Sequence, residues 1–183
     1  ALISDGHTVV VFDNLHSGKK DKLHKKASLV VGDVTELADL EAVFEAHQFD
    51  TVMHFAAKKS VAESQQEPAL YFRNNVLGTL NILTCMAKYS VPQIIFSSTA
   101  AVYKADDAPS QLFTEESAVA PASVYGQSKL MSETLIQEFY NTSKISSYVI
   151  LRYFNVAGDS GLDYREDAAQ NVSDQGVVAI AQE

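Results

Sequence analysis

The sequence contains a single cysteine, Cys85, so no disulfide can form within the chain. It has no tryptophan and only four prolines. Its apolar runs all fall short of the roughly 18 residues that a membrane-spanning helix needs, and no secretory signal peptide is visible. Because secreted disulfide-rich chains and membrane-anchored chains carry features that are missing here, we expect a cytoplasmic protein with no membrane partner.

Positive charge is also scarce. The chain has 14 lysines and arginines against 23 aspartates and glutamates, which gives a net charge of −9. An acidic surface repels phosphate backbones, so we expect no nucleic-acid partner. The longest basic run, residues 19–26, is short and interrupted, which is typical of a solvated loop. No group of histidines, cysteines or carboxylates has metal-ligand spacing, so we expect no metal site.

The chain does contain enough apolar sequence for one domain with a core, since 46% of its 183 residues are hydrophobic. Five apolar runs have the length of strands. They are nearly continuous rather than alternating, as expected for parallel strands covered on both faces. These runs are residues 7–13, 28–33, 51–57, 93–98 and 147–155.

Segments with helical periodicity separate the later strands. They cover residues 35–47, 68–89 and 123–140, and the first two would start at Thr35 and Pro68. Strands that alternate with helices predict an α/β fold with a doubly wound parallel sheet. The last apolar residues, from 177 onward, are interpreted as the first turns of a further helix.

The ends of the predicted strands carry polar and small residues. Ligands of doubly wound sheets bind beyond the carboxyl ends of the strands. Asp13 ends the first strand, where an acidic side chain can accept hydrogen bonds from the adenine ribose of a dinucleotide. A turn or helix-capping aspartate is an equally good interpretation of this residue alone. The later strands end in Asp33, in residues 54–57 and in the hydroxyl run 97–99, so together they predict one site.

The segment 124–133 is the strongest chemical signal. Tyr125 and Lys129 are four residues apart at a predicted helix start, so their side chains point the same way. Lowering a tyrosine pKa from about 10 to about 7 needs roughly 4 kcal/mol. An ammonium about 5 Å away supplies roughly 3 kcal/mol at an effective dielectric constant of about 20. The pair could therefore form a phenolate that takes a proton from an alcohol, and Thr99 could bridge substrate and tyrosine.

Other reactive side chains have simpler interpretations. Tyr140 and Lys144 repeat the same spacing, but the Asn-Thr-Ser run between them favours a helix end, so we interpret this pair as a decoy. His54 lies inside an apolar strand and is interpreted as a core residue. Cys85 lies within a predicted helix and is interpreted in the same way.

Motifs in the order and spacing of a known family run along the chain to about residue 159. On these motifs the chain resembles the extended short-chain dehydrogenase/reductase family, and within it the enzymes that epimerise UDP-hexoses at C4 in galactose metabolism. Ala100 and Ala101 stand where a sugar-nucleotide dehydratase of this family would carry an acidic pair, which argues against dehydration. The motifs are DNL (13–15), GDV (32–34), HFAA–K (54–59), NNVLGTLNIL (74–83), FSSTAAVY (96–103), YGQSK (125–129) and LRYFNVAG (151–158).

The resemblance implies a Rossmann-like fold with tightly held NAD, and reversible hydride transfer from C4 of a UDP-hexose through a 4-keto sugar. Tyr125 would deprotonate the 4-hydroxyl, and Lys129 would hold the nicotinamide ribose and lower the tyrosine pKa. Thr99 would relay or orient the proton, and Asn155 would contact the UDP moiety. Besides Thr99, Tyr125 and Lys129, the implied cofactor-binding residues are Asp13, Asn14, Asp33, Val34, Phe55, Ala56, Ala57, Lys59, Asn75 and Phe154.

The sequence departs from the family in several places. The first strand with its glycine-rich phosphate loop and the carboxyl-terminal sugar-nucleotide domain have no counterpart. We therefore expect residues 1–159 to form a partial NAD-binding domain and residues 160–183 to begin the segment that leads to a sugar-nucleotide domain. The sheet should then expose edges where the first strand belongs, and this chain by itself should be inactive and poorly stable. Lys104 replaces a family glycine, and residues 164–178 match the family's uridine-contacting segment poorly.

The resemblance also implies a homodimer that forms through the helices at 68–89 and 123–140. Two alternatives stay open: another NAD-dependent nucleotide-sugar epimerase or dehydratase, and a non-catalytic NAD-binding protein on the same fold. The presence of Thr99, Tyr125 and Lys129 argues against the second alternative, because a binding module needs no phenolate.

Overall fold

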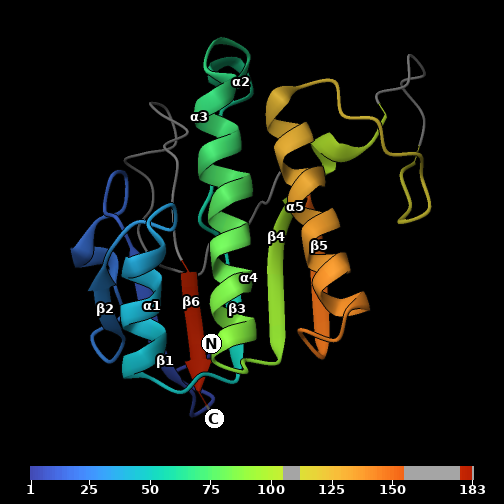
Figure 1. Ribbon diagram of the computed structural model, residues 1–183. Helices are drawn as coiled ribbons and strands as arrows, with labels where there is room; N and C mark the ends of the chain where they lie inside the picture. Colours follow the sequence, from blue (N-terminus) through green and yellow to red (C-terminus); the bar gives the residue numbers. More distant parts are fainter. Residues whose placement is uncertain (105–111, 155–177, 183) are drawn as a thin grey trace.

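The computed structural model describes residues 1–104, 112–154 and 178–182 (Figure 1). The strands are β1 (Thr8–Asp13), β2 (Ser28–Val31), β3 (Thr51–His54), β4 (Gln93–Thr99), β5 (Ser147–Tyr153) and β6 (Val178–Gln182). The α-helices are α1 (Leu37–Ala46), α2 (Val61–Gln66), α3 (Pro68–Tyr71), α4 (Gly78–Lys88) and α5 (Val124–Asn141). The 3₁₀ turns η1 (Lys20–Lys22) and η3 (Ala100–Val102) and the π-helical segment η2 (Phe72–Leu77) connect them. The α/β fold with parallel strands is thereby confirmed.

The strands form one sheet in the order β2-β1-β6-β3-β4-β5. β1 runs parallel to β2, and β3, β4 and β5 run parallel to one another. In the longest pairing, β4 and β5 are in register from Gln93 opposite Ser147 to Thr99 opposite Tyr153. The carboxyl ends of β1, β3 and β4 therefore face one edge of the sheet, as the sequence predicted.

β6 lies between β1 and β3 and is antiparallel to both, with Ile180 opposite Val10 on one side and Val52 on the other. Two predictions are thus wrong. The residues after 177 form a strand rather than a helix, and the space between β1 and β3 is filled rather than left as exposed edges. A short apolar run has no decisive period of its own, and here the unpaired backbone groups of β1 and β3 select the strand.

Helices α1, α4 and α5 lie side by side on one face of the sheet, with α4 in the middle (Figure 1). Their apolar stripes meet the sheet in a core that includes Phe12, Leu40, Ile82, Phe96 and Ile136, all fully buried. The sequence predicted that both faces of the sheet are covered. Within the described ranges, these three helices all cover the same face. None of the helices described is both long and apolar enough to cross a membrane.

The predicted helix boundaries hold with two differences. The helix expected over 68–89 begins at Pro68 but runs through η2, where the register is π-helical before α4 begins. Thr35 does not cap α1, which begins after Glu36. Its amide and hydroxyl instead donate to Asp33. α5 begins where expected, with the Ser123 hydroxyl accepting from the Gly126 amide at 3.0 Å.

Candidate functional site

Asp13 ends β1 in a tight turn. Its side chain is buried, and its Oδ1 accepts a hydrogen bond from the Leu15 amide at 2.7 Å. Leu15 has a φ of 56°, in the left-handed region, so the chain turns back sharply. A Cβ at Gly18 would stand 3.1 Å from both carboxylate oxygens, which shows how closely the loop approaches. Burial raises the pKa of Asp13, so a further donor from a ligand would stabilise its ionised form.

Asp33 lies just beyond β2 and has several donors. The amide and hydroxyl of Thr35 both reach its Oδ1 at 2.9 Å, and the Asn14 side chain reaches its Oδ2 at 3.1 Å. Burial acts to raise the pKa of Asp33, but these hydrogen bonds and the charge of Arg73 hold it below its ordinary value. The bond from Asn14 also joins the loops after β1 and β2, so this carboxylate is both charged and fixed in place.

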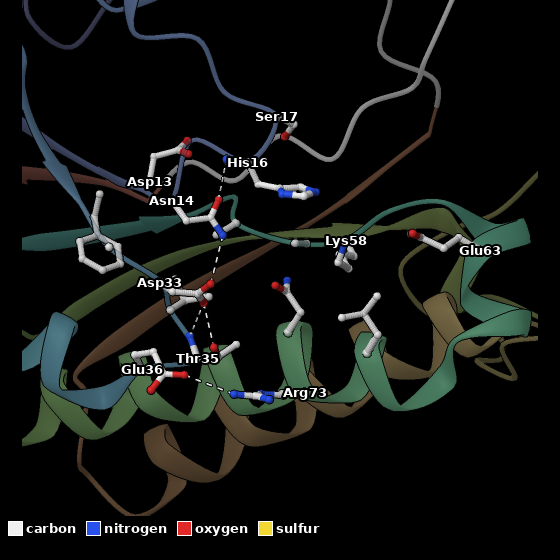
Figure 2. Close-up of a pocket in the computed structure, with 17 residues that line it drawn as sticks. Asp13, Asn14, His16, Ser17, Asp33, Thr35, Glu36, Lys58, Glu63 and Arg73 are labelled. Atoms are coloured by element: carbon white, nitrogen blue, oxygen red, sulfur yellow. Dashed lines mark hydrogen bonds and ion pairs between the residues drawn. The ribbon is translucent and has the colours of Figure 1, made fainter.

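A cavity of about 580 Å³ opens beside these two carboxylates, a volume typical of small-molecule sites. Figure 2 shows side chains of the loop after β1 along one side and helical side chains along the other, where Arg73 pairs with Glu36 at 3.2 Å. The lining residues are Phe12, Asp13, Asn14, His16, Ser17, Gly32, Asp33, Val34, Thr35, Glu36, Ala56, Ala57, Lys58, Glu63, Leu70, Arg73 and Asn74.

The cavity brings together part of the predicted cofactor set. Asp13, Asn14, Asp33, Val34, Ala56 and Ala57 line it. Phe55, Lys59, Asn75 and Phe154 are absent from its lining. The structure adds residues that no motif predicted, above all His16, Ser17 and Arg73. Their positions depend on how the loop after β1 folds back and on which face of η2 turns inward, and neither is visible in a local pattern.

Tyr125 and Lys129 lie in the first turns of α5, as predicted. The Tyr125 ring packs edge-on against Tyr71, with ring centroids 6.5 Å apart. A Cβ at Gly126 would stand 2.4 Å from the Ala101 carbonyl oxygen, so α5 begins directly against the turn that follows β4. That turn starts with Thr99, whose hydroxyl accepts from the Ala101 amide at 3.2 Å. The tertiary structure therefore places the turn at Thr99 against the helix start that carries Tyr125.

Lys129 is only 2% exposed, and its ammonium lies 4.4 Å from the centroid of the Phe96 ring. No hydrogen bond joins it to another residue within the described ranges. Burial lowers the pKa of Lys129 to about 7, although the charge of Glu133 acts to raise it. A ligand hydroxyl that reached Lys129 would accept a hydrogen bond from its ammonium.

Asn75 connects the loop after β3 to α5. Its side-chain amide donates to the Lys58 carbonyl at 3.0 Å and to the Ser128 hydroxyl at 2.9 Å, and its oxygen accepts from the Lys58 amide at 2.8 Å. Ser128 in turn donates to the Tyr125 carbonyl at 2.7 Å. Asn75 thus braces the first turn of α5, and its predicted contact with a cofactor stays a prediction.

Phe154 follows β5 and is 60% exposed. It stacks on Tyr103 at 6.5 Å and lies 6.1 Å from Phe113, and the Arg152 guanidinium covers Tyr103 at 4.9 Å. This aromatic group borders the end of β5. Asn155, the predicted UDP contact, lies outside the described residues.

The structure also places the other reactive side chains that the sequence analysis interpreted. His54 is a core residue, with its Nε2 3.0 Å from the Thr79 hydroxyl, and Cys85 is fully buried in the core. α5 ends at Asn141, so Tyr140 is exposed at its last turn and Lys144 lies beyond it, as expected of a decoy. The residues that the structure describes contain no group of three or more metal-ligating side chains able to hold an ion.

Sequence reasoning missed one buried ion pair. Arg152 and Glu133 meet at 2.6 Å, and Ser98 donates to the same carboxylate. The signal that could have found it is a second four-residue step, from Lys129 to Glu133, along the helix face that carries Tyr125.

Comparison with known proteins agrees with this geometry. The family model described as "NAD dependent epimerase/dehydratase family" matches residues 1–182. A curated UDP-glucose 4-epimerase of Halalkalibacterium halodurans is 40% identical over 161 residues, which cover 86% of this chain and 46% of that relative. This chain thus spans about half the length of the curated relatives that it matches.

Two solved structures are similar in fold as well as sequence. The UDP-glucose 4-epimerase of Thermotoga maritima, crystallised with UDP-glucose, has a TM-score of 0.80 at 34% identity, covering 86% of this chain and 50% of its own. The UDP-glucose 4-epimerase of Bifidobacterium longum, in complex with NAD+ and UDP, has a TM-score of 0.78 at 36% identity, covering 84% of this chain and 48% of its own.

Proposed function

Because this chain belongs to the NAD dependent epimerase/dehydratase family, we propose that it forms the cofactor-binding part of a UDP-glucose 4-epimerase. The observation that carries the proposal is the position of Tyr125 and Lys129. They lie in the first turns of α5, where the helix packs against the turn that begins at Thr99. The names of the relatives support the same activity. Ala100 and Ala101 favour epimerisation over dehydration, since neither can supply an acid.

The residues around the cavity are suited to NAD. Asp13 and Asn14 can accept and donate hydrogen bonds to the adenine ribose, and the charge of Asp13 repels a 2′-phosphate. Val34, Ala56 and Ala57 leave room for a flat ring close to the backbone. The buried ammonium of Lys129 suits the hydroxyls of the second ribose. NAD held by these residues would supply the acceptor for a hydride from a substrate carbon and the donor for its return.

Side chains of this chain then carry out the proton transfer. The Oη of Tyr125 takes the proton of the sugar 4-hydroxyl and gives it back to the same oxygen when the other epimer forms. The Lys129 ammonium stabilises the phenolate form of Tyr125. Thr99 orients the 4-hydroxyl from the end of β4. The family resemblance further implies that Phe55, Lys59, Asn75 and Phe154 contact the cofactor and that Asn155 contacts the UDP moiety.

The test uses the purified protein that contains this chain. Adding UDP-galactose should produce the absorbance of reduced cofactor and then UDP-glucose. Tyr125→Phe should slow epimerisation by about 10²- to 10⁴-fold, the usual contribution of a general base. Tyr140→Phe is the matched control and should leave the rate unchanged, because the decoy tyrosine lies at the far end of α5.

The outcomes separate the remaining alternatives. Epimerisation by Tyr125→Phe at the parental rate would disprove the mechanism. Bound NAD that is never reduced by a UDP-sugar would indicate the non-catalytic NAD-binding protein instead.

We propose that the whole protein is a homodimer joined through the helical segment 68–89, which comprises α3, η2 and α4, and through α5. Leu77, Leu80 and Met131 support this interface, because they are large apolar side chains exposed on adjacent helical elements. Sedimentation velocity of the whole protein should show a dimer, and a monomer at micromolar concentration would contradict it. We propose a cytoplasmic location, which is supported by Cys85, the single cysteine of this chain, because it lies buried and free. The domain division at residue 159 falls among residues that the structure does not describe.

A further inference from the structure

Glu133 is the most deeply buried carboxylate of the described ranges, with a side chain 1% exposed. It lies in α5 and is held by two strands. Arg152 of β5 reaches it with two nitrogens, Nη2 at 2.6 Å from Oε2 and Nε at 3.1 Å from Oε1. The Ser98 hydroxyl of β4 donates to Oε1. These charge-assisted hydrogen bonds tie α5 to both strands.

Two steps of four residues place this carboxylate in line with the proposed catalytic pair. Tyr125, Lys129 and Glu133 follow one another on one face of α5. On β4, Phe96 and Ser98 point to the same side of the strand. Lys129 lies over Phe96, and Glu133 is bonded to Ser98. The helix and the strand are therefore in register, with the ammonium above one residue and the carboxylate above the other.

We propose that Glu133 is a positioning residue, which keeps the Lys129 side chain charged and aligned with Tyr125, and that Arg152 and Ser98 hold Glu133 in that place. The proposal rests on the function proposed above and adds a residue outside the Thr99, Tyr125 and Lys129 set. Glu133 needs no contact with substrate or cofactor, because it acts through the lysine.

The charges that face Lys129 support this role. From β3, His54 packs on the same Phe96 ring at 5.4 Å and is held neutral, since burial and the nearby lysine charge lower its pKa to about 3. From α5, Glu133 supplies a negative charge one turn away. From β5, Arg152 offsets that charge. From η2, the uncharged side chain of Asn75 bonds to Ser128, the residue before Lys129. Burial makes it harder for Lys129 to keep its proton, and the charge of Glu133 opposes this effect. Because Arg152 pairs with Glu133, we expect it to weaken the contribution of Glu133.

These opposed charges predict opposite effects for two substitutions. Glu133→Gln keeps the shape but removes the negative charge, so the titration midpoint of Lys129 should fall. Arg152→Gln removes the positive charge that partly cancels the negative charge of Glu133, so the titration midpoint of Lys129 should rise. Each shift should be about tenfold or more in proton affinity, because a charge one helical turn away acts here at low dielectric. Glu138→Gln, an exposed change on the same helix, is the matched control and should shift nothing.

The measurement is an NMR titration of lysine side chains in the protein containing this chain, with the Lys129 signal assigned by its loss in Lys129→Met. If Glu133→Gln does not fold, Glu133→Asp keeps the charge and should keep the parental midpoint, and Arg152→Gln still tests the sign. Equal midpoints in Arg152→Gln and parent, or shifts of the same sign in both substitutions, would overturn the proposal.

The pH profile of epimerisation is the second measurement. Glu133→Gln should move the limb that reports Tyr125 to higher pH, because a neutral lysine no longer stabilises the phenolate. A profile identical to that of the parent would also overturn the proposal. If the parent shows no epimerase activity at all, the proposed function fails while the NMR titration still decides the role of Glu133.

Discussion

Buried polar side chains of this protein are held by specific partners, and the few that lack one stand out. Asn75 and Ser132 are fully buried, yet each bonds to neighbouring backbone or hydroxyl groups. His54 is different, since its Nδ1 is the buried side-chain nitrogen or oxygen without a partner among the residues described. Lys129 is a buried cation whose ammonium lies over the Phe96 ring. Such groups carry most of the pH dependence of a fold, because only one of their protonation states suits the interior.

The first prediction concerns His54→Gln. The pKa of His54 is lowered to about 3 by burial and by the Lys129 charge, from an ordinary value of 6.5. Between these values the unfolded chain binds a proton that the folded protein excludes, so stability falls as the pH falls. The substitution removes this titration. Urea unfolding should therefore show a smaller loss of stability from pH 6.5 to pH 4 in the variant, by on the order of 1–3 kcal/mol.

His24→Gln is the control for this measurement, because His24 is exposed. It should keep the parental pH dependence. If His54→Gln lost stability on acidification as steeply as the parent, the histidine would not be held neutral in the core.

At the scale of elements, the start of α5 is the junction on which the proposed chemistry depends. Ser123 caps the helix, Asn75 braces its first turn through Ser128, and η3 lies against it. The π-helical register of η2 contributes to this, because Asn75 lies within it and its carbonyl accepts the Thr79 and Ser132 hydroxyls. π-helical turns are frequent at functional sites. Here the turn places a bracing side chain rather than a reactive one.

The second prediction concerns Gly126→Ala at this junction. Alanine favours a helix by about 1 kcal/mol over glycine, but its Cβ would stand 2.4 Å from the Ala101 carbonyl oxygen. Backbone cannot move aside as a side-chain tip can, so the clash should outweigh the gain. We expect a net loss of about 1–3 kcal/mol in the free energy of unfolding. If the proposed function holds, the rate of epimerisation should fall as well, since Tyr125 is displaced.

Gln127→Ala is the control for the contact between Gly126 and Ala101, because it places an alanine on the same turn of α5 at an exposed position. It should change stability by no more than about 0.5 kcal/mol. A Gly126→Ala protein as stable and active as the parent would show that α5 and η3 have room for a Cβ at this position.

At the scale of the whole molecule, β6 joins two parallel groups of strands into one sheet. β1 and β2 form one group, and β3, β4 and β5 form the other. The cavity lies where these groups meet, with Asp13 from one side and Ala56 and Ala57 from the other. The central strand therefore holds together the two halves of the proposed cofactor site.

The third prediction concerns Ile180→Pro in β6. Ile180 pairs with Val10 and Val52 on opposite sides, and proline in the middle of a sheet removes a ladder hydrogen bond. The free energy of unfolding should fall by roughly 2–4 kcal/mol. Ile180→Val keeps the amide and should cost less than about 1.5 kcal/mol. Urea midpoints that are equal in parent and Ile180→Pro would show that β6 does not pair at the centre of the sheet.

Several features followed from the sequence by itself, because they depend on local periodicity and on residue chemistry. The apolar runs determined β1 through β5, and helical periodicity with Ser123 and Pro68 determined where the helices begin. The spacing of Tyr125 and Lys129 identified the proposed catalytic pair, and the Asn-Thr-Ser run after Tyr140 rejected the second pair with that spacing. The acidic end of β1 identified one side of the cavity. These signals lie within a few residues of one another.

Only the tertiary structure decided the rest, because it depends on which distant segments meet. The pairing of β6 with β1 and β3 was decided by backbone groups far away in sequence, against the local helical interpretation. The place of Arg73 in the cavity depends on packing of η2 beside the loop after β1. The burial of Lys129 and its charge balance with Glu133 and Arg152 depend on the register of α5 with β4 and β5. Long-range contacts of this kind leave no short pattern in a single sequence, since each partner alone is an ordinary residue of its element.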